Sequence, residues 1–157
     1  MFARKFIDHV DTHADQLCNE FMHKIEGSNR CIELLHKVPV EEHEQSIRAI
    51  YRGMTDWLLN GTDLVTQDLY VNLGMRRAQQ GVPLCELFWA MCLNREYFWE
   101  YMERETLLDE PVDFWGGAQL LHSIYQFFDR AFYFVIMGYQ TVTKDEGYGA
   151  TTVSASK

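Results

Sequence analysis

The chain has 157 residues, of which 47% are hydrophobic and 14% aromatic, so it is long and apolar enough for one packed domain and too apolar for a disordered segment. Fourteen basic residues against 23 acidic ones give a net charge of -9, which disfavours nucleic acid as a partner. No apolar stretch has the length of a secretion signal or a membrane span, so we expect a cytoplasmic protein that does not bind membranes.

Hydrophobic spacing predicts helices along almost the whole chain. Apolar residues recur every three or four positions from Phe6 to Ile25, which predicts one first helix that ends at Gly27. A short helix is expected over residues 30–37. A longer one follows Pro39, because glutamates occupy its first turn and an apolar face continues to Asn60.

The second half of the chain continues this pattern. A helix with a less regular apolar face precedes Gly81, and a stripe of apolar residues then runs from Leu84 to Met102. The last helix is expected from about Asp113 to Tyr139. Strand signals are absent, so the predicted fold is all-α, an irregular bundle of five or six helices, with a globin-like arrangement as the alternative.

Two further features concern the limits of the domain and its thiols. The composition becomes small and polar after Thr143, so we expect a helical domain over residues 1–143 and a polar flexible tail over 144–157. The cysteines lack CxxC spacing and a chain of this size needs no disulfides. We therefore expect free thiols, mostly buried, at Cys18, Cys31, Cys85 and Cys92.

The most informative segment is residues 73–99, LGMRRAQQGVPLCELFWAMCLNREYFW. Gly81 lets the backbone leave a helix at little steric cost, and Pro83 suits the first turn of the next helix. The segment therefore predicts a basic helix, a sharp break and an aromatic helix. Arg76 and Arg77 precede the break and could bind an anionic group or a partner's backbone, or lie on a solvated helix face.

Within this segment, RAQQGVPLCELFWA resembles the arginine, "QGVPL" and leucine-rich motif of the N-terminal sensor domain of RsbRD-type co-antagonists of RsbT, a stressosome-related input domain. The likeness is sharp over Leu73 to Trp99 and diffuse from about Phe6 to Tyr139. It implies a helical input domain of the kind that precedes a STAS output domain in bacterial stress regulation of RsbT and sigma-B. No STAS domain follows here, so either a stand-alone domain or part of a longer protein is expected.

An ion pair is expected across the bundle. Arg95 interrupts the apolar stripe, and a guanidinium removed from water must be paired because leaving it unpaired costs several kcal/mol. Asp129, on the last helix among aromatic residues, is the candidate partner. The alternative is that Arg95 reaches the rim of the bundle with its charged end in water.

Aromatic residues of the last two helices also suggest a ligand pocket. The pocket would hold a small apolar ligand. His122 could instead ligate haem iron there, or be an ordinary core or boundary histidine. The candidate lining residues are Phe88, Trp89, Cys92, His122, Tyr125 and Phe128.

Metal binding is an alternative that rests on spacing near the N-terminus. His9 and His13 are four residues apart, so they share a helical face. Glu20 and His23 form a Glu-x-x-His pair, which recurs at Glu33 and is the spacing of di-iron bundles. Only 13 residues and a glycine separate the two copies, so solvated histidines near helix ends are the competing interpretation.

The last helix has a second apolar face at Tyr133, Phe134 and Met137. This face predicts either a homodimer interface or a helix surrounded within its own domain. No nucleophile with a base, no phosphate loop and no clear metal signature is present, so no enzyme and no resident cofactor are expected. We predict a regulatory input or sensor domain with a regulatory protein partner. The alternative is a haem- or metal-binding bundle with a redox or gas-sensing role.

Overall fold

The computed structural model describes residues 2–61, 64–105 and 111–154, with side chains over 4–61, 67–105 and 116–144. These residues form helices and no strand, so the all-α prediction is confirmed. Seven helices lie in this part of the chain: α1 Phe2–Thr12, α2 Ala14–Glu26, α3 Ile32–Lys37, α4 Val40–Asn60, α5 Leu64–Gln79, α6 Leu84–Arg104 and α7 Pro111–Ser154.

The helix count exceeds the predicted five or six because the first predicted helix is two helices. The break lies at His13, whose backbone leaves the helical region at φ -111 and ψ 21. Its imidazole Nδ1 lies 3.0 Å from the carbonyl oxygen of His9, which also accepts the backbone N–H of His13. Thr12 and His13 are weak helix formers. The apolar spacing continues across this break and so conceals it from a periodicity argument.

The last helix is longer than expected. It begins at Pro111, close to the predicted Asp113, and its backbone stays helical to Ser154. The sequence predicts a flexible tail from residue 144, whereas the described backbone is helical over 144–154. The domain boundary at residue 143 stays a prediction.

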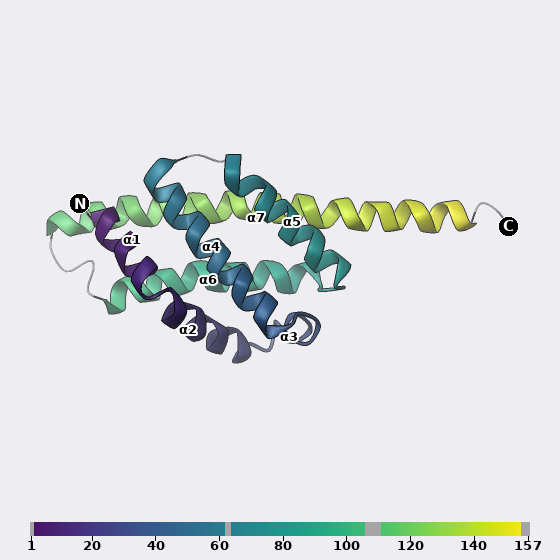
Figure 1. Ribbon diagram of the computed structural model, residues 1–157, viewed down its shortest axis with the longest axis horizontal. Coiled ribbons are helices and arrows are strands. Elements are labelled where there is room, and N and C mark those ends of the chain that lie inside the picture. The colour runs from purple at the N-terminus through teal and green to yellow at the C-terminus, as the bar shows by residue number, and fades with distance from the viewer. Residues whose placement is uncertain (1, 62–63, 106–110, 155–157) are drawn as a thin grey trace.

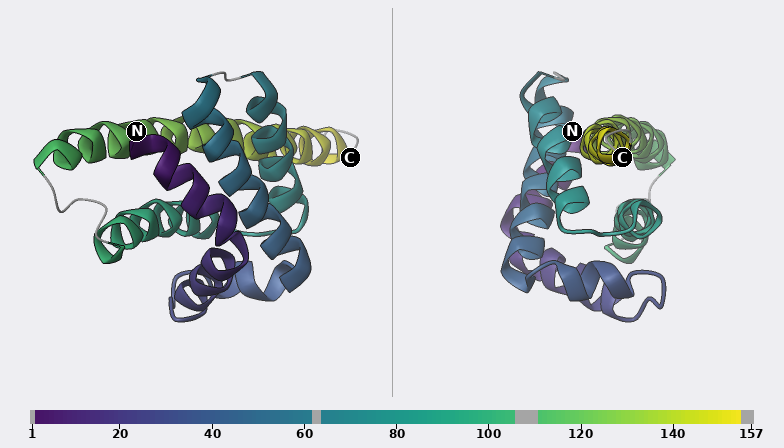
Figure 2. Two further views of the ribbon diagram at one scale, coloured as in Figure 1. Left: turned by 60° about the vertical axis from the view of Figure 1, so that its left-hand side comes forward. Right: turned by 90° about the vertical axis from the view of Figure 1, so that its right-hand side faces the viewer.

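The arrangement of the helices is that of an irregular bundle built around α6 and α7. The long α7 runs the length of the molecule, and its C-terminal part extends past the other helices (Figure 1). Seen nearly end-on, α6 and α7 lie on one flank and α1, α4 and α5 on the other (Figure 2, right). Among the described residues, no helix combines the length and apolar content that crossing a bilayer requires.

The core is rich in aromatic rings. Phe98 of α6 is fully buried and packs within ring-centroid distances of 5.1 Å of Tyr51, 6.1 Å of Phe6 and 6.2 Å of Phe128. These contacts join α1, α4, α6 and α7 around one residue. Such aromatic pairs add to the free energy gained from burial alone.

The four cysteines are free, in agreement with the sequence. Cys18 and Cys31 are buried, and burial raises the pKa of the Cys31 thiol to about 11. Cys92 is half-buried and Cys85 is exposed. The expected burial therefore holds for two of the four.

A close approach between α5 and α7 fixes the position of the last helix. A methyl group added at Gly74 would overlap the carbonyl oxygen of Val135 and lie 2.8 Å from its carbonyl carbon. One added at Gly138 would overlap the carbonyl oxygen of Val71. Only glycine lets two backbones come this near. The two glycines therefore set the contact between the helix of the basic motif and the helix that leaves the bundle.

Candidate functional site

The Gly81-Val82-Pro83 break has the geometry that the sequence predicts. Gly81 has φ +74, and its N–H donates to the carbonyl of Ala78, while the N–H of Val82 donates to that of Arg77. These bonds satisfy carbonyls at the end of α5, as a left-handed helix cap does. Pro83 then precedes α6 in an extended conformation. Val82 is fully buried, so the break is part of the packed structure.

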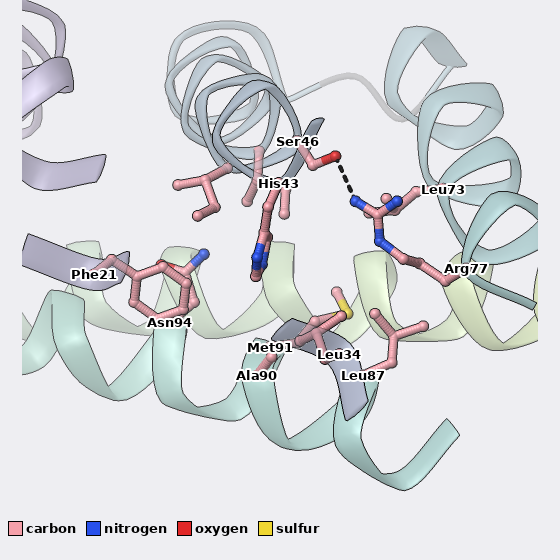
Figure 3. Close-up of a pocket in the computed structure, with 12 residues that line it drawn as sticks. Phe21, Leu34, His43, Ser46, Leu73, Arg77, Leu87, Ala90, Met91 and Asn94 are labelled. Atoms are coloured by element: carbon pink, nitrogen blue, oxygen red, sulfur yellow. Dashed lines mark hydrogen bonds between the residues drawn. The ribbon is translucent and has the colours of Figure 1, made fainter. Parts of the chain in front are cut away.

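A carboxylate on α4 organises the residues that lead to this break. Oε1 of Glu42 accepts hydrogen bonds from Arg76 Nε at 3.0 Å, Arg77 Nη1 at 2.8 Å and Gln80 Nε2 at 3.0 Å. Arg77 Nη2 also donates to Ser46 Oγ at 2.9 Å (Figure 3). We call these five residues the Glu42 cluster. It joins α4 to the end of α5 through charged hydrogen bonds, which are the stronger kind.

Burial and neighbouring charges shift the pKa values of groups in and beside the Glu42 cluster. The guanidinium of Arg77 is 2% exposed, and burial lowers its pKa. The hydrogen bonds from Arg76 and Arg77 hold the pKa of the Glu42 carboxyl below its usual range. Burial, aided by the charge of Arg77, lowers the pKa of the adjacent His43 to about 4. His43 is therefore neutral at physiological pH, while the Arg77 and Glu42 charges compensate each other.

This geometry changes the interpretation of the two motif arginines. The sequence predicts an anionic group or a partner's backbone as their target, or a solvated face. Their anion is Glu42 of the same chain. A solvated face fits Arg76, whose side chain is 57% exposed, but not Arg77, which is buried.

The break also contacts two other helices. Lys37 Nζ of α3 donates to the carbonyl of Gly81 at 2.9 Å. The hydroxyl of Tyr139 on α7 donates to the carbonyl of Val82 at 2.7 Å. The end of α5, the start of α6 and the last helix are thus held together at one point.

A small cavity lies beside the Glu42 cluster, between α2, α3, α4, α5 and α6 (Figure 3). It offers about 30 Å³ to the centres of water-sized molecules. Asn94 is 2% exposed, and its Oδ1 has no hydrogen-bond partner among the described residues. We call this space the central cavity. Its lining residues are Phe21, Leu34, His43, Ser46, Ile47, Ile50, Leu73, Arg77, Leu87, Ala90, Met91 and Asn94.

The residues of the predicted aromatic pocket differ in their exposure. His122 and Tyr125 are exposed, Phe88 is 41% exposed, Trp89 and Cys92 are half-buried, and Phe128 alone is buried. The reason is helical register. On α6, the residues at 87, 91, 94 and 98 face the core, so the row at 88, 92, 95 and 99 falls on the edge beside α7.

Two of the predicted pocket residues line an open surface groove instead. Cys92 and Tyr125 border it together with Arg95, Glu96 and Trp99. The groove is roughly ten times larger than the central cavity, at about 340 Å³.

The predicted ion pair is present at the edge of the same groove. Arg95 Nη1 lies 3.1 Å from Asp129 Oδ1. The guanidinium also lies 4.8 Å from the centre of the Tyr125 ring. The side chains of Arg95 and Asp129 are 30% and 67% exposed, so the pair is at the rim, where ion pairs contribute little to stability.

The first two histidines of the alternative metal site lie together but have other contacts. His9 and His13 stack with ring centroids 5.1 Å apart. Nδ1 of His9 lies 2.8 Å from the hydroxyl of Tyr101. A ring nitrogen of His9 is thus already occupied by a protein group.

Glu20 and His23, the other two candidate metal ligands, have separate contacts. Glu20 accepts hydrogen bonds from Tyr97 at 2.6 Å and Arg104 at 3.0 Å, and the bond from Tyr97 lowers its pKa. The His23 side chain is 84% exposed and lies 3.6 Å from Glu26. Within the described residues no three His, Cys, Asp or Glu side chains are placed to hold a metal ion. The four residues are therefore not brought together as one ligand set.

The predicted interface residues lie on the outer face of α7. Tyr133 is 63% exposed, and Phe134 and Met137 are half-buried. Beside Tyr133 is an open recess of about 320 Å³, which Gln126, Asp129, Arg130 and Phe134 border.

Several residues of the site were missed by sequence reasoning. Glu42 was interpreted only as a favourable residue for a helix start. His43 and Asn94 carried a usable signal, because each occupies a position on the apolar stripe of its helix, four residues before Ile47 and Phe98. A polar residue at such a position predicts a buried polar group. The pairing of Glu42 with Arg77 had no comparable signal, because it depends on how two helices cross.

Comparison with known proteins identifies the family of the chain. Residues 11–147 match the model of the RsbT co-antagonist protein rsbRD N-terminal domain. The match includes the Glu42 cluster, the central cavity, the break and most of α7. Neither a curated protein nor a solved structure matches the chain. The chain belongs to the family of rsbRD N-terminal domains of RsbT co-antagonist proteins.

Proposed function

We propose that this chain is the regulatory input domain of a bacterial, cytoplasmic stress-response system. It acts by binding a regulatory protein partner and by forming a homodimer, without catalysing a reaction. The family assignment supports the regulatory role. The observation that carries the proposal is the hydrogen bond from Tyr139 to Val82, because it connects the family's motif directly to the helix that leaves the bundle.

The Glu42 cluster supplies the means of transmission. A change in how α4 crosses α5 alters the hydrogen bonds of Arg77 and Gln80, which precede the break by four residues or fewer. The break holds Tyr139, so the change reaches α7. A ligand or partner shifts such an equilibrium only if it binds one of the two helix packings more tightly than the other.

The outer face of α7 suits a second copy of this chain. A net charge of -9 makes two copies repel each other, so association needs a local apolar contact. Tyr133 protrudes at the edge of the open recess that Phe134 also borders. A twofold axis brings the same patch of each copy together. Each Tyr133 can therefore enter the recess of the other copy.

Light scattering after size-exclusion chromatography tests the dimer. The wild type at micromolar concentration should have twice the 18.5 kDa mass of the chain, and Tyr133→Asp should elute as a monomer. Ile32→Asp is the matched control, because Ile32 is 48% exposed on α3, a helix that lies apart from α7 (Figure 1). A monomeric wild type, or loss of the dimer in both variants, contradicts the proposed interface.

A reporter assay tests the regulatory role. In a bacterium whose stress promoter depends on RsbT, expression of the chain should change the reporter signal, and Tyr133→Asp should weaken the change. An unchanged reporter with wild-type chain present at normal levels contradicts this role.

We propose that the domain works without a resident haem or metal. This is consistent with the exposure of His122 and with the protein contacts of Glu20 and His9. A Soret band in the purified protein, or a stoichiometric transition metal in elemental analysis, would contradict it.

A further inference from the structure

We infer that the open groove between α6 and α7 binds the guanidinium group of an arginine side chain on a protein partner, which pairs with Glu96 and stacks on Trp99. That this protein is the regulatory partner rests on the function proposed above, whereas the binding of an arginine does not. We call the site the α6–α7 groove, and the residues that border it are Cys92, Arg95, Glu96, Trp99 and Tyr125.

The shape of the α6–α7 groove favours a side chain of a partner protein over a free small molecule. The groove has a volume of about 340 Å³ and is open to the surface. Sites for small molecules usually enclose most of the ligand, whereas this groove would leave a free ligand partly in water. A side chain that enters from a partner is covered by the surrounding contacts of the interface, which exclude water.

The one cation that borders the groove is already engaged within the chain. Arg95 Nη1 lies 3.1 Å from Asp129 Oδ1. The guanidinium also lies 4.8 Å from the centre of the Tyr125 ring and 5.4 Å from that of Phe132. Asp129 therefore compensates the charge of Arg95 before any partner binds. The contact with Tyr125 also shows that an aromatic residue of this groove accepts a guanidinium on its ring.

Glu96 and Trp99 are the lining residues that keep their capacity for recognition. In the described part of the chain, neither side chain has a hydrogen bond, an ion pair or a ring contact with another residue. Glu96 is exposed and Trp99 is half-buried, and both border the groove. They are three positions apart on α6, so their side chains are neighbours on the helix surface. A carboxylate and an indole ring thus lie side by side, open to the same ligand.

This pair of groups matches the chemistry of an arginine. A carboxylate can accept two parallel hydrogen bonds from one guanidinium, and tryptophan is the ring that attracts a cation most strongly. A planar guanidinium can make both contacts at once, whereas the ammonium group of lysine acts as a point charge. The net charge of -9 also attracts a basic partner and speeds its association.

The position of the α6–α7 groove is compatible with the proposed dimer. The groove and the open recess beside Tyr133 have no lining residue in common. Arg95 borders the groove and Asp129 borders the recess, so their ion pair lies between the two sites. A partner in the groove and a second copy at the recess therefore use different residues.

NMR of the full chain tests the inference with a hexa-arginine peptide as the probe. The indole N–H signal of Trp99, identified by its loss in Trp99→Phe, should shift along a saturable curve. Glu96→Gln should bind the peptide roughly two- to fivefold more weakly, as expected for loss of one exposed ion pair. This variant should fold, because Glu96 is exposed. Glu41→Gln is the matched control, because it removes the same charge at an exposed position of α4.

Salt and a second peptide distinguish this site from general attraction to an acidic protein. At about 0.15 M salt, charges more than about 8 Å apart are largely screened, so Glu41→Gln should bind like the wild type. Hexalysine should shift the Trp99 signal with lower affinity, since it lacks the planar group.

Four results overturn the inference. They are an unmoved Trp99 signal, equal affinities of the wild type and Glu96→Gln, equal weakening by Glu41→Gln, and equal affinities for hexalysine and hexa-arginine. None of them depends on the dimer or the reporter. A saturable Trp99 shift together with an unchanged reporter would contradict the proposed function and leave the arginine site in place.

Discussion

The glycine contact between α5 and α7 makes a prediction that can be worked out from the structure. Gly138→Ala places a methyl group on the carbonyl oxygen of Val71 and 3.0 Å from its Cα. Non-bonded heavy atoms in contact lie roughly 3.5–4.0 Å apart, and the overlap with the carbonyl oxygen is the largest one, so the helices must separate by at least about 1 Å. Overpacking costs about 1–3 kcal/mol. We take the upper value, because main-chain atoms cannot rotate aside.

Alanine also has a higher helix propensity than glycine, by about 1 kcal/mol. The net loss for Gly138→Ala is therefore about 2 kcal/mol, which lowers the melting temperature by roughly 4–8 °C for a chain of this size. Thermal unfolding followed by circular dichroism measures this. The matched control is Gly27→Ala, where the new methyl lies an ordinary 3.6 Å from the nearest carbonyl oxygen. It should be neutral or slightly stabilising. Equal melting temperatures for Gly138→Ala and the wild type would refute the close contact.

Three further predictions concern single side chains. The pKa of His43 is about 4 in the folded state and 6.5 in the unfolded state, so the unfolded state binds an extra proton between these pH values. The free energy of unfolding should therefore decrease by about 3 kcal/mol as pH falls from 6.5 to 4. Urea unfolding of His43→Gln should show a smaller decrease. Asp129→Asn should change the free energy of unfolding by less than about 1 kcal/mol, since the pair with Arg95 is exposed; a larger loss in urea unfolding would contradict a rim position. Tyr139→Phe should lose about 0.5–1.5 kcal/mol in the same assay, and no loss would mean that the bond to Val82 contributes nothing.

The fold was predictable where it depends on local patterns. Apolar periodicity located most helices, and Gly81 with Pro83 located the break. The split at His13 could not be predicted from periodicity, because the apolar spacing continues through it and only the local backbone conformation changes. The helical backbone over 144–154 was not predicted, because the polar composition there was taken to favour a flexible tail, although such a composition does not by itself exclude a helix.

The site was predictable only in part, because it depends on which helix faces meet. The motif marked the break correctly, but the partner of Arg77 lies 35 residues earlier on α4. The pocket expected at Phe88, Trp89 and Cys92 stays a prediction. The sequence places these residues on α6 but does not tell which neighbouring helix each of them meets. The pair between Arg95 and Asp129 could be predicted from the sequence, because a charged residue within an apolar stripe needs a partner of opposite charge.

Hydrogen–deuterium exchange of Glu42→Gln tests most directly whether the Glu42 cluster controls the last helix. Glutamine keeps the size of the side chain and one acceptor oxygen but removes the charge that Arg77 requires. Exchange should become faster in residues 78–83 and also in residues 135–143 of α7, because Tyr139 is bound to the break. Faster exchange confined to α4 and α5, with α7 as protected as in the wild type, would contradict transmission through the break.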